Sequence, residues 1–457
     1  MDKKIHYFST NGKAPKVSFR DALLKGLAPD NGLYMPDTIP SLSAAEIREY
    51  ADVPYYQIAY NVLYKYLHAE IDADDLLRLV ADAYTYAVPL EPVYERKYVM
   101  RLDAGPTASF KDFAARMMGR LMQYFLAREN QKLLILAATS GDTGSAVANA
   151  FYRLDNIKVL ILFPEKEVTE MQRRQMTTLK KNVQIIAIDG KFDDCQAMVK
   201  RSFMDEELRV LKLSSANSIN IGRLLPQSVY YIYAFAKLYN KQPDDTIVFS
   251  VPCGNFGNLM GGLLARTMGL PVDKFIISTN ENNEVPLYFE TNVYKLIVPS
   301  KNCISSAMNV GHPSNMARII SLYGGWMNEK GEILIPPDME KMKRDMCAVS
   351  ISDDQTRQTI RQAYDTYKLF LEPHGAVAWA GLQWYLNGEE KHDHSEKLCV
   401  SLETAHPAKF PEEIQRILSV YPELPPALFG LMEKEESYDS LPVDYAVFKK
   451  YLLDRYA

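Results

Sequence analysis

The sequence predicts an α/β protein built on largely parallel sheet. Short apolar runs recur along the chain at residues 133–138, 158–163, 183–188, 246–251, 275–278 and 398–402. Stretches with helical spacing of apolar residues lie between these runs, and the clearest extends from Lys111 to Glu129. Short buried strands that alternate with helices are typical of parallel sheets with helical crossovers. This alternation sets the predicted fold class.

We expect three regions along the chain. Residues 1–95 are rich in tyrosine and proline and predict short helices and turns, with helical spacing from 44 to 66. Residues 96–410 contain the strand–helix alternation and form the expected core, in two subdomains. Residues 411–457 carry several prolines and predict an appended helical tail. A chain of 457 residues is too long for one compact core, which agrees with this division.

The composition is that of a globular protein, with 47% hydrophobic residues, 24% charged residues and a formal net charge of −5. A mildly acidic chain is a poor general partner for nucleic acid or an anionic membrane, and we expect neither. The first residues lack the apolar run of a secretory signal, and no stretch is long enough to span a bilayer. The five cysteines are odd in number and lack a CxxC spacing, which indicates reduced thiols in a cytoplasmic protein. A monomer and a homodimer are both compatible with the sequence.

Three of the apolar runs end in loops of unusual composition, at strand ends where open α/β sheets bind ligands. The first loop, at 139–144, is Thr-Ser-Gly-Asp-Thr-Gly and precedes a helical stretch. Hydroxyls and free backbone N–H groups at the start of a helix form an anion site. We favour this function over a plain capped turn.

The second loop is Gly-Asn-Phe-Gly-Asn at 254–258, after the run at 246–251. Its glycines would let the backbone approach a phosphate closely, although a tight turn would also explain them. The glycine spacing does not match the dinucleotide pattern GxGxxG, and no Walker A lysine follows. The loop therefore suits a phosphate monoester without a metal, and it argues against a nucleotide-binding oxidoreductase.

The third loop, residues 403–410, brings together a hydroxyl at Thr404, an imidazole at His406 and an ammonium at Lys409. For His406 we favour a hydrogen-bonding residue over a direct chemical role, because a lone histidine is weak evidence. His392 and His394 lie in a charged stretch that we expect to be a solvated surface, so no metal site is predicted.

Lys111 lies at the start of the long helical stretch. Ser109 and Asp112 have the spacing of a capping box, which would place Lys111 in the first helical turn. There its ammonium would face the positive end of the helix dipole, between Phe110 and Phe113. Both effects would lower the pKa of Lys111 and favour the neutral amine that a Schiff base requires. A surface lysine at a helix start is an equal alternative on these grounds.

Arg223 ends the segment Asn-Ser-Ile-Asn-Ile-Gly-Arg at 217–223. Its guanidinium could hold a phosphate or a carboxylate in a bidentate fork. A structural salt bridge would explain the arginine equally well.

These segments together resemble the microbial form of the threonine synthase family. The likeness lies in PTASFKDF at 106–113, ATSGDTG at 138–144, NSIN at 217–220 with Arg223, GNFGN at 254–258 and TAHPAKF at 404–410. STNG at 9–12 and DNGLY at 30–34 are also similar to family segments. The shared order of these motifs, from about residue 6 to 412, makes the resemblance specific. The tail that follows carries no recognised motif.

The resemblance implies two open, mainly parallel-sheet domains of the tryptophan-synthase-β-like type, called fold type II, with pyridoxal 5'-phosphate as cofactor. Lys111 would hold the cofactor as a Schiff base, and the loop at 254–258 would bind its phosphate through backbone N–H groups. Thr404 would face the pyridine nitrogen, and Asp142 stands where many relatives have asparagine near the ring hydroxyl. The implied cofactor-binding residues are Lys111, Asp142, Gly254, Asn255, Phe256, Gly257, Asn258 and Thr404. The candidates for binding the substrate's phosphate and carboxylate are Ser140, Thr143, Asn217 and Arg223.

The implied reaction converts O-phospho-L-homoserine and water into L-threonine and phosphate, by γ-elimination and β-addition. Lys111 would act as the base that moves protons between substrate carbons, and the cofactor would act as the electron sink. Three alternatives stay open. One is a related pyridoxal-phosphate phospho-lyase or dehydratase that yields a 2-oxoacid, and the second is a nucleotide-binding oxidoreductase. The third is a non-catalytic relative that binds the cofactor or a protein partner, and the intact Lys111 segment argues against it.

Overall fold

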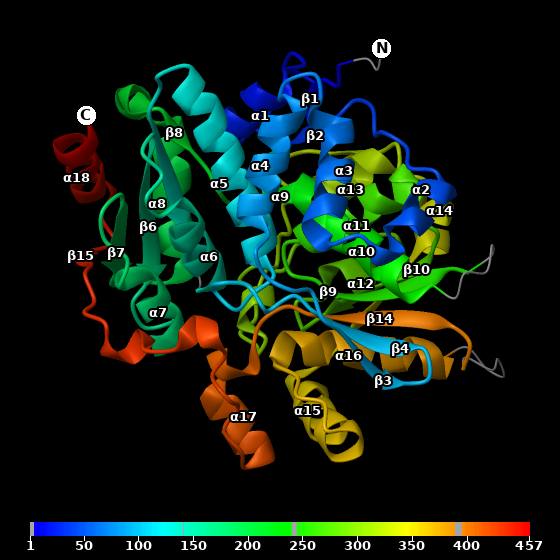
Figure 1. Cartoon of the computed structure of the whole chain (residues 1–457). Coiled ribbons are helices and arrows are strands. Elements are labelled where there is room, and N and C mark those ends of the chain that lie inside the picture. Colours follow the sequence, from blue (N-terminus) through cyan, green and yellow to red (C-terminus); the bar gives the residue numbers. More distant parts are fainter. Residues whose placement is uncertain (1–3, 140, 240–244, 389–394) are drawn as a thin grey trace.

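The computed structural model describes residues 4–139, 141–239, 245–388 and 395–457. Two mainly parallel sheets form the body of the molecule, and helices lie on both faces of each (Figure 1). The predicted α/β class with two open, mainly parallel sheets is therefore confirmed.

The smaller sheet has the strand order β15-β7-β6-β5-β8, and all its pairings are parallel. Its strands are β5 (Leu133–Ala138), β6 (Ile157–Pro164), β7 (Val183–Ile188), β8 (Leu213–Ser214) and β15 (Asp439–Leu441). Helices α5 (Lys111–Arg128), α6 (Asp142–Phe151), α7 (Glu170–Thr177) and α8 (Phe192–Met204) accompany it. Every residue of β5 is buried, because helices cover both faces of the sheet.

The larger sheet has the order β13-β10-β9-β14-β4-β3, and only its edge strand β3 is antiparallel among the described strands. Its strands are β3 (Leu90–Tyr94), β4 (Lys97–Arg101), β9 (Ile247–Pro252), β10 (Val272–Thr279), β13 (Met346–Ser350) and β14 (Leu398–Glu403). The helices of this part are α9 (Ile221–Leu224), α10 (Ser228–Leu238), α11 (Gly257–Met268), α12 (Glu284–Thr291), α13 (Met316–Leu322), α14 (Met339–Asp345), α15 (Asp353–Tyr367) and α16 (Pro373–Gly388). A short hairpin, β11 (Trp326–Met327) and β12 (Ile333–Ile335), lies beside α13.

The hydrophobic core divides along the faces of the sheets. On β5, Leu133, Ile135 and Ala137 join the large central cluster, which also contains residues of the larger sheet and the N-terminal helices. The alternate β5 residues join a separate cluster under α8 and the last helix of the chain. The two sheets therefore share one core, which fixes the strand ends of both sheets relative to each other.

The N-terminal region contains the antiparallel pair β1 (Tyr7–Ser9) and β2 (Tyr34–Pro36) and helices α1 (Phe19–Lys25), α2 (Ala44–Glu49), α3 (Tyr55–Leu67) and α4 (Ala73–Ala83). The helical spacing expected from 44 to 66 is interrupted. After α2 the chain makes a 3-10 turn, η1 (Tyr50–Asp52), and Pro54 then caps α3. Proline has no N–H to donate and disfavours helix at the preceding residue, and Val53 is extended here.

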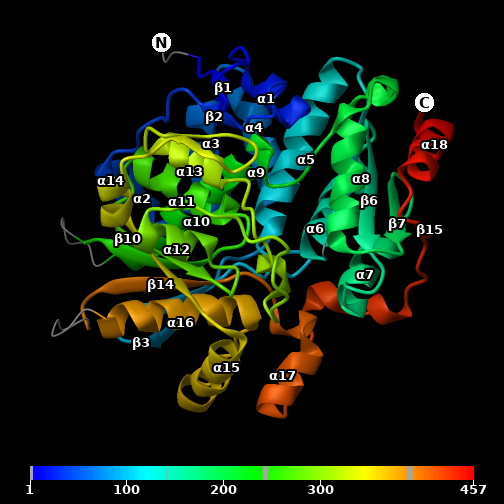
Figure 2. The same cartoon turned by 180° about the vertical axis from the view of Figure 1, so that it is seen from behind.

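The tail is only partly the helical segment that the sequence predicts. It contains α17 (Pro411–Leu418), the 3-10 turns η6 (Pro426–Leu428) and η7 (Leu431–Glu433), and α18 (Tyr445–Tyr456). Between the turns and α18 it also forms β15, which pairs with β7 at the edge of the smaller sheet. Figure 2 shows this path from α17 to α18 beside the smaller sheet.

None of the helices in the described residues has the length and apolar character needed to cross a membrane.

Candidate active site

The loops after β5 and β14 meet where the two sheets adjoin. Strands β9 and β14 are parallel neighbours, so the loops that follow them leave the same edge of the larger sheet. The loop after β14 carries Lys409, whose Nζ lies 2.6 Å from Oδ1 of Asp142, in the loop after β5. The predicted ligand-binding loops from both sheets are therefore in contact.

Lys111 is the first residue of α5, as the sequence predicts. Its side chain is 14% exposed, and its Nζ lies 3.9 Å from Oδ2 of Asp142. The adjacent Phe110 N–H donates to the carbonyl of Thr404 at 2.9 Å, which joins the lysine segment to the loop after β14. Burial lowers the pKa of Lys111 to about 8; Asp142 opposes this shift, and the charges of Lys409 and Arg223 support it.

The capping box predicted from Ser109 and Asp112 is wrong. Helix α5 has no side-chain cap, and the Oγ of Ser109 is buried without a hydrogen-bond partner among the described residues. The Asp112 carboxylate instead accepts from the backbone N–H of Thr107 at 2.8 Å and from its hydroxyl at 2.7 Å. Asp112 therefore closes the loop before Lys111 and leaves the start of α5 open.

The predicted influence of the two phenylalanines on Lys111 also needs correction. Nζ of Lys111 lies 4.8 Å from the centre of the Phe110 ring, a cation–π position that favours the charged amine. Phe113 packs against Tyr55 and Tyr230 within the core. The predicted direction of the pKa shift is right, but the cause is burial together with neighbouring cations.

Asp142 begins α6 and is almost fully buried. Its Oδ1 accepts from Lys409 and, at 3.0 Å, from Nε2 of Gln172. Burial alone would raise the pKa of Asp142, but Lys409 and Lys111 hold it below its ordinary value. Gly141 precedes it with φ of 133°, and a side chain there would collide with Gln172.

Two further candidates lie in this loop. Thr143 is partly exposed in the first turn of α6. Ser140 lies outside the described residues, as do His392 and His394.

The glycine loop 254–258 is built for a close approach to the start of α11. Phe256 has φ of 61° and caps this helix, so the backbone N–H groups of Gly257 and Asn258 stand at its open N-terminus. A Cβ on Gly254 would lie 2.9 Å from the carbonyl oxygen of Ala307. The side chain of Asn258 accepts from the hydroxyls of the two tyrosines at 230 and 231, which anchors the start of the helix.

The segment with Asn217 and Arg223 adjoins the glycine loop, because Nδ2 of Asn255 donates to the hydroxyl of Ser218 at 2.8 Å. Arg223 is buried on α9, and Nη1 donates to the carbonyl of Ala216 at 2.7 Å. Its Nε and Oδ1 of Asn217 are buried and have no partner among the described residues. Burial lowers the pKa of Arg223 to about 10. In the described part of the chain Arg223 forms no salt bridge, so the structural alternative lacks support.

The three polar residues of the loop after β14 have different neighbours from one another. Thr404 is buried beside Phe110. Nδ1 of His406 accepts from the N–H of Ala408 at 3.2 Å, which is the hydrogen-bonding role favoured above. Lys409 is fully buried.

Sequence reasoning missed three supporting residues of this site. Lys409 was noted only as part of the third loop, and Gln172 carried no signal at all. Nδ1 of His374 contacts the Glu372 carboxylate, and Nε2 of His374 accepts a hydrogen bond from the backbone N–H of Ala307 at 3.0 Å. It thereby supports the chain against which Gly254 packs. Such roles depend on tertiary contacts, which local sequence spacing does not predict.

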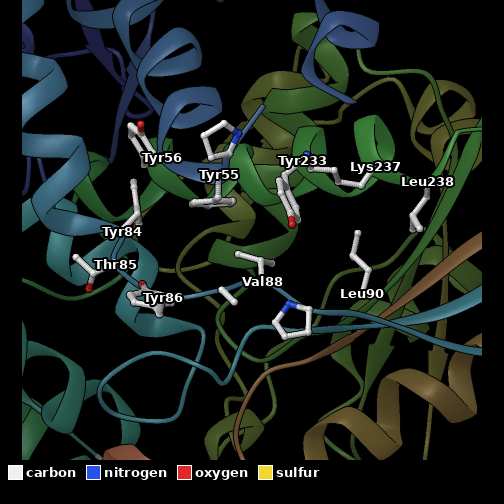
Figure 3. A pocket seen from close by; sticks show the side chains of 13 residues that line it. Tyr55, Tyr56, Tyr84, Thr85, Tyr86, Val88, Leu90, Tyr233, Lys237 and Leu238 are labelled. Atoms are coloured by element: carbon white, nitrogen blue, oxygen red, sulfur yellow. The ribbon is translucent and has the colours of Figure 1, made fainter. Parts of the chain in front are cut away.

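A cavity of about 780 Å³ contains none of the candidate residues. It is lined by residues 54–56, 84–90, 233, 237 and 238. Figure 3 shows Tyr84, Thr85 and Tyr86 at one end and Leu90, Lys237 and Leu238 at the other. It approaches the site through Phe113, whose carbonyl accepts from the hydroxyl of Tyr84.

The donor set fits an aldehyde cofactor that carries a phosphate. A partly buried lysine with a lowered pKa supplies the amine, and an open helix N-terminus with a glycine approach suits the phosphate. Polar atoms of Ser109, Asn217 and Arg223 are buried without a hydrogen-bond partner among the described residues. Fold and site together define the class of pyridoxal-phosphate-dependent enzymes.

Three family models match the chain. "Threonine synthase N terminus" matches residues 6–84, "Pyridoxal-phosphate dependent enzyme" matches 87–402, and "Threonine synthase, C-terminal" matches 380–452. The threonine synthase of Haemophilus influenzae is 39% identical over 443 residues, which cover 96% of this chain and 97% of that protein. The threonine synthase of Escherichia coli is 37% identical, with 96% and 97% covered.

A solved structure agrees with these matches. The PLP-bound threonine synthase from Brucella melitensis superposes with a TM-score of 0.91 and 35% identity, and 99% of each chain is covered. A threonine deaminase from Solanum lycopersicum, 17% identical with a TM-score of 0.53, shares the fold alone. The chain belongs to the threonine synthase family, and it is a pyridoxal-phosphate-dependent lyase of amino-acid biosynthesis that acts on a small-molecule substrate.

Proposed function

We propose that this protein converts O-phosphohomoserine and water into threonine and inorganic phosphate. Lys111 carries this proposal. Its side chain is only 14% exposed at the start of α5, it has a pKa of about 8, and it lies 3.9 Å from the Asp142 carboxylate. A lysine of this kind is neutral often enough near neutral pH to bind an aldehyde and to exchange protons with a substrate.

The same site would hold the cofactor. Pyridoxal phosphate, when bound, supplies an electron sink for carbanion chemistry on the substrate. The backbone N–H groups of 254–258 would bind its phosphate at the start of α11, where the helix dipole favours an anion. Asp142 and Thr404 would face the polar groups of its ring. The full set we assign is Lys111, Asp142, Gly254, Asn255, Phe256, Gly257, Asn258 and Thr404.

The substrate brings a phosphate of its own, so the reaction needs a second anion pocket. Arg223 and Asn217 support this assignment, because each has a buried polar atom without a partner among the described residues. Thr143 stands at the start of α6, where an anion is also favoured. Ser140 joins the proposal on its sequence position.

Within this arrangement Lys111 would move protons between the substrate carbons as phosphate leaves and water adds. The low exposure of Lys111 and Asp142 would limit competing water at the reacting atoms. We further propose that the protein acts in the cytoplasm as a monomer or homodimer, without a nucleic-acid or membrane partner. The five cysteines, which all lie in the described residues, are free thiols, and this supports a reducing compartment.

Product analysis tests the reaction. The purified protein with pyridoxal phosphate is incubated with O-phosphohomoserine, and phosphate and the organic product are followed together. Equal amounts of phosphate and threonine are expected. Phosphate with 2-oxobutyrate would replace the proposal by a phospho-lyase on the same fold, and no phosphate would remove the substrate assignment.

A further inference from the structure

Lys409 is the second lysine of the site and, unlike Lys111, is fully buried. Its ammonium donates to Oδ1 of Asp142 at 2.6 Å and to the carbonyl of Thr107 at 3.0 Å. Thr107 closes the loop that leads into Lys111, and Asp142 faces the amine of Lys111. From the strand end of the larger sheet, Lys409 therefore contacts both segments that surround Lys111.

The two oxygens of the Asp142 carboxylate have different neighbours. Oδ1 is held by Lys409 and by Gln172, whereas Oδ2 faces Lys111 at 3.9 Å, beyond hydrogen-bond distance. Hydrogen bonds from a charged and a neutral donor at one oxygen restrain the carboxylate from turning toward Lys111. Without Lys409 this restraint would be lost, and Asp142 would gain by pairing with Lys111.

We infer that Lys409 is a positioning residue that neutralises Asp142 and holds it off Lys111, which keeps Lys111 available as a neutral amine. The inference rests on the proposed function, since it takes Lys111 as the lysine that binds the cofactor. The charge of Lys409 beside the same carboxylate lowers the pKa of Lys111, which is the less tightly bound of the two amines. Removal of Lys409 should therefore raise the pKa of Lys111, and removal of the Asp142 carboxylate should lower it.

The test measures the reactivity of Lys111 in the full-length, cofactor-free chain. A trace of acetic anhydride labels neutral amines in competition, and mass spectrometry of the peptide that contains Lys111 gives its labelling rate as a function of pH. Exposed Lys132 serves as the reference within the same digest. The variants are Lys409→Gln, Asp142→Asn, the double variant, and Lys409→Arg, which retains the charge.

Near neutral pH, Lys409→Gln should slow the labelling of Lys111 by about tenfold, and Asp142→Asn should accelerate it. The double variant and Lys409→Arg should both return close to the wild-type rate. An unchanged rate in Lys409→Gln, or a double variant as slow as that single variant, would overturn the inference.

Circular dichroism checks that each variant is folded. If Lys409→Gln does not fold, the remaining variants decide, because slower labelling in Asp142→Asn would equally overturn the inference. These rates do not depend on product formation. An enzyme that makes no threonine would refute the proposed function without touching this result.

Discussion

Two lysines approach the same carboxylate from different parts of the molecule. Lys409 comes from the larger sheet, is fully buried, and has two acceptors within hydrogen-bond distance. Lys111 begins α5, is 14% exposed, and lies 3.9 Å from its nearest carboxylate oxygen. Burial alone therefore does not separate the roles proposed for the two lysines. Lys409 has two acceptors in reach and Lys111 has none within hydrogen-bond distance among the described residues, which fits a fixed cation at Lys409 and the chemical role proposed for Lys111.

The largest effect is expected from removal of the Lys111 amine. Lys111→Ala should reduce threonine formation by roughly 10³-fold or more, because it removes both the nucleophile and the base. The measurement is the rate of threonine and phosphate release, with thermal unfolding as the check on folding. Activity within tenfold of wild type would place the chemistry on another residue.

The fixed cation should matter most for stability. Lys409→Met leaves the Asp142 carboxylate buried without its closest cation, which should cost about 3–5 kcal/mol of unfolding free energy. The matched control is Lys180→Met, which breaks an exposed pair with Glu435 of similar length, 2.7 Å, and should cost less than about 1 kcal/mol. Denaturant titration measures both. Equal losses of unfolding free energy in the two variants would show that the buried and the exposed ion pair contribute equally to stability.

Arg223 extends the comparison to a third cation, which is buried and has no carboxylate partner in the described chain. Arg223→Ala should raise the KM for O-phosphohomoserine by roughly 10- to 100-fold, because a charge-assisted hydrogen bond to the substrate is lost. Arg223→Lys should recover part of this loss in affinity, because the positive charge is retained while the bidentate geometry of the guanidinium is lost. Unchanged substrate affinity in both variants would exclude Arg223 from the second anion pocket.

The smallest expected effect is the pH dependence that Lys111 gives to stability. Its pKa is about 8 in the folded chain against an ordinary value of 10.5, so between these values the unfolded chain binds more protons. The contribution of Lys111 to the stability of the cofactor-free chain therefore rises with pH in this window and is flat outside it. Relative to Lys111→Met, the wild type should gain roughly 2 kcal/mol between the lower and upper parts of this window. A constant difference would mean that the amine keeps its ordinary pKa in the fold.

Local composition predicted much of this molecule. The apolar run 133–138 coincides with β5 at both ends, because a strand covered on both faces needs continuous apolar residues. The loops at 139–144, 254–258 and 403–410 lie at strand ends as predicted, and the two from the larger sheet leave neighbouring strands. The tail strand β15 was not predicted, since its three residues include Asp and Ser and carry no apolar signal.

Other features of the site depend on contacts that no local pattern contains. The Asp142–Lys409 pair joins residues from two sheets, and either residue alone looks like an ordinary loop residue. The capping box failed for a different reason. Asp112 had two possible partners nearby, and the loop at Thr107 offered two donors where Ser109 offered one.

The edge position of β15 has a consequence for the order in which the chain folds. Strand β7 stands next to the rim of the smaller sheet and is covered there by residues 439–441, which are synthesised long after residues 183–188. Until the last helix has left the ribosome, β7 presents unpaired N–H and C=O groups to solvent and to other nascent chains. Chains that stop before residue 439 should therefore aggregate during synthesis, although the whole catalytic core is already made.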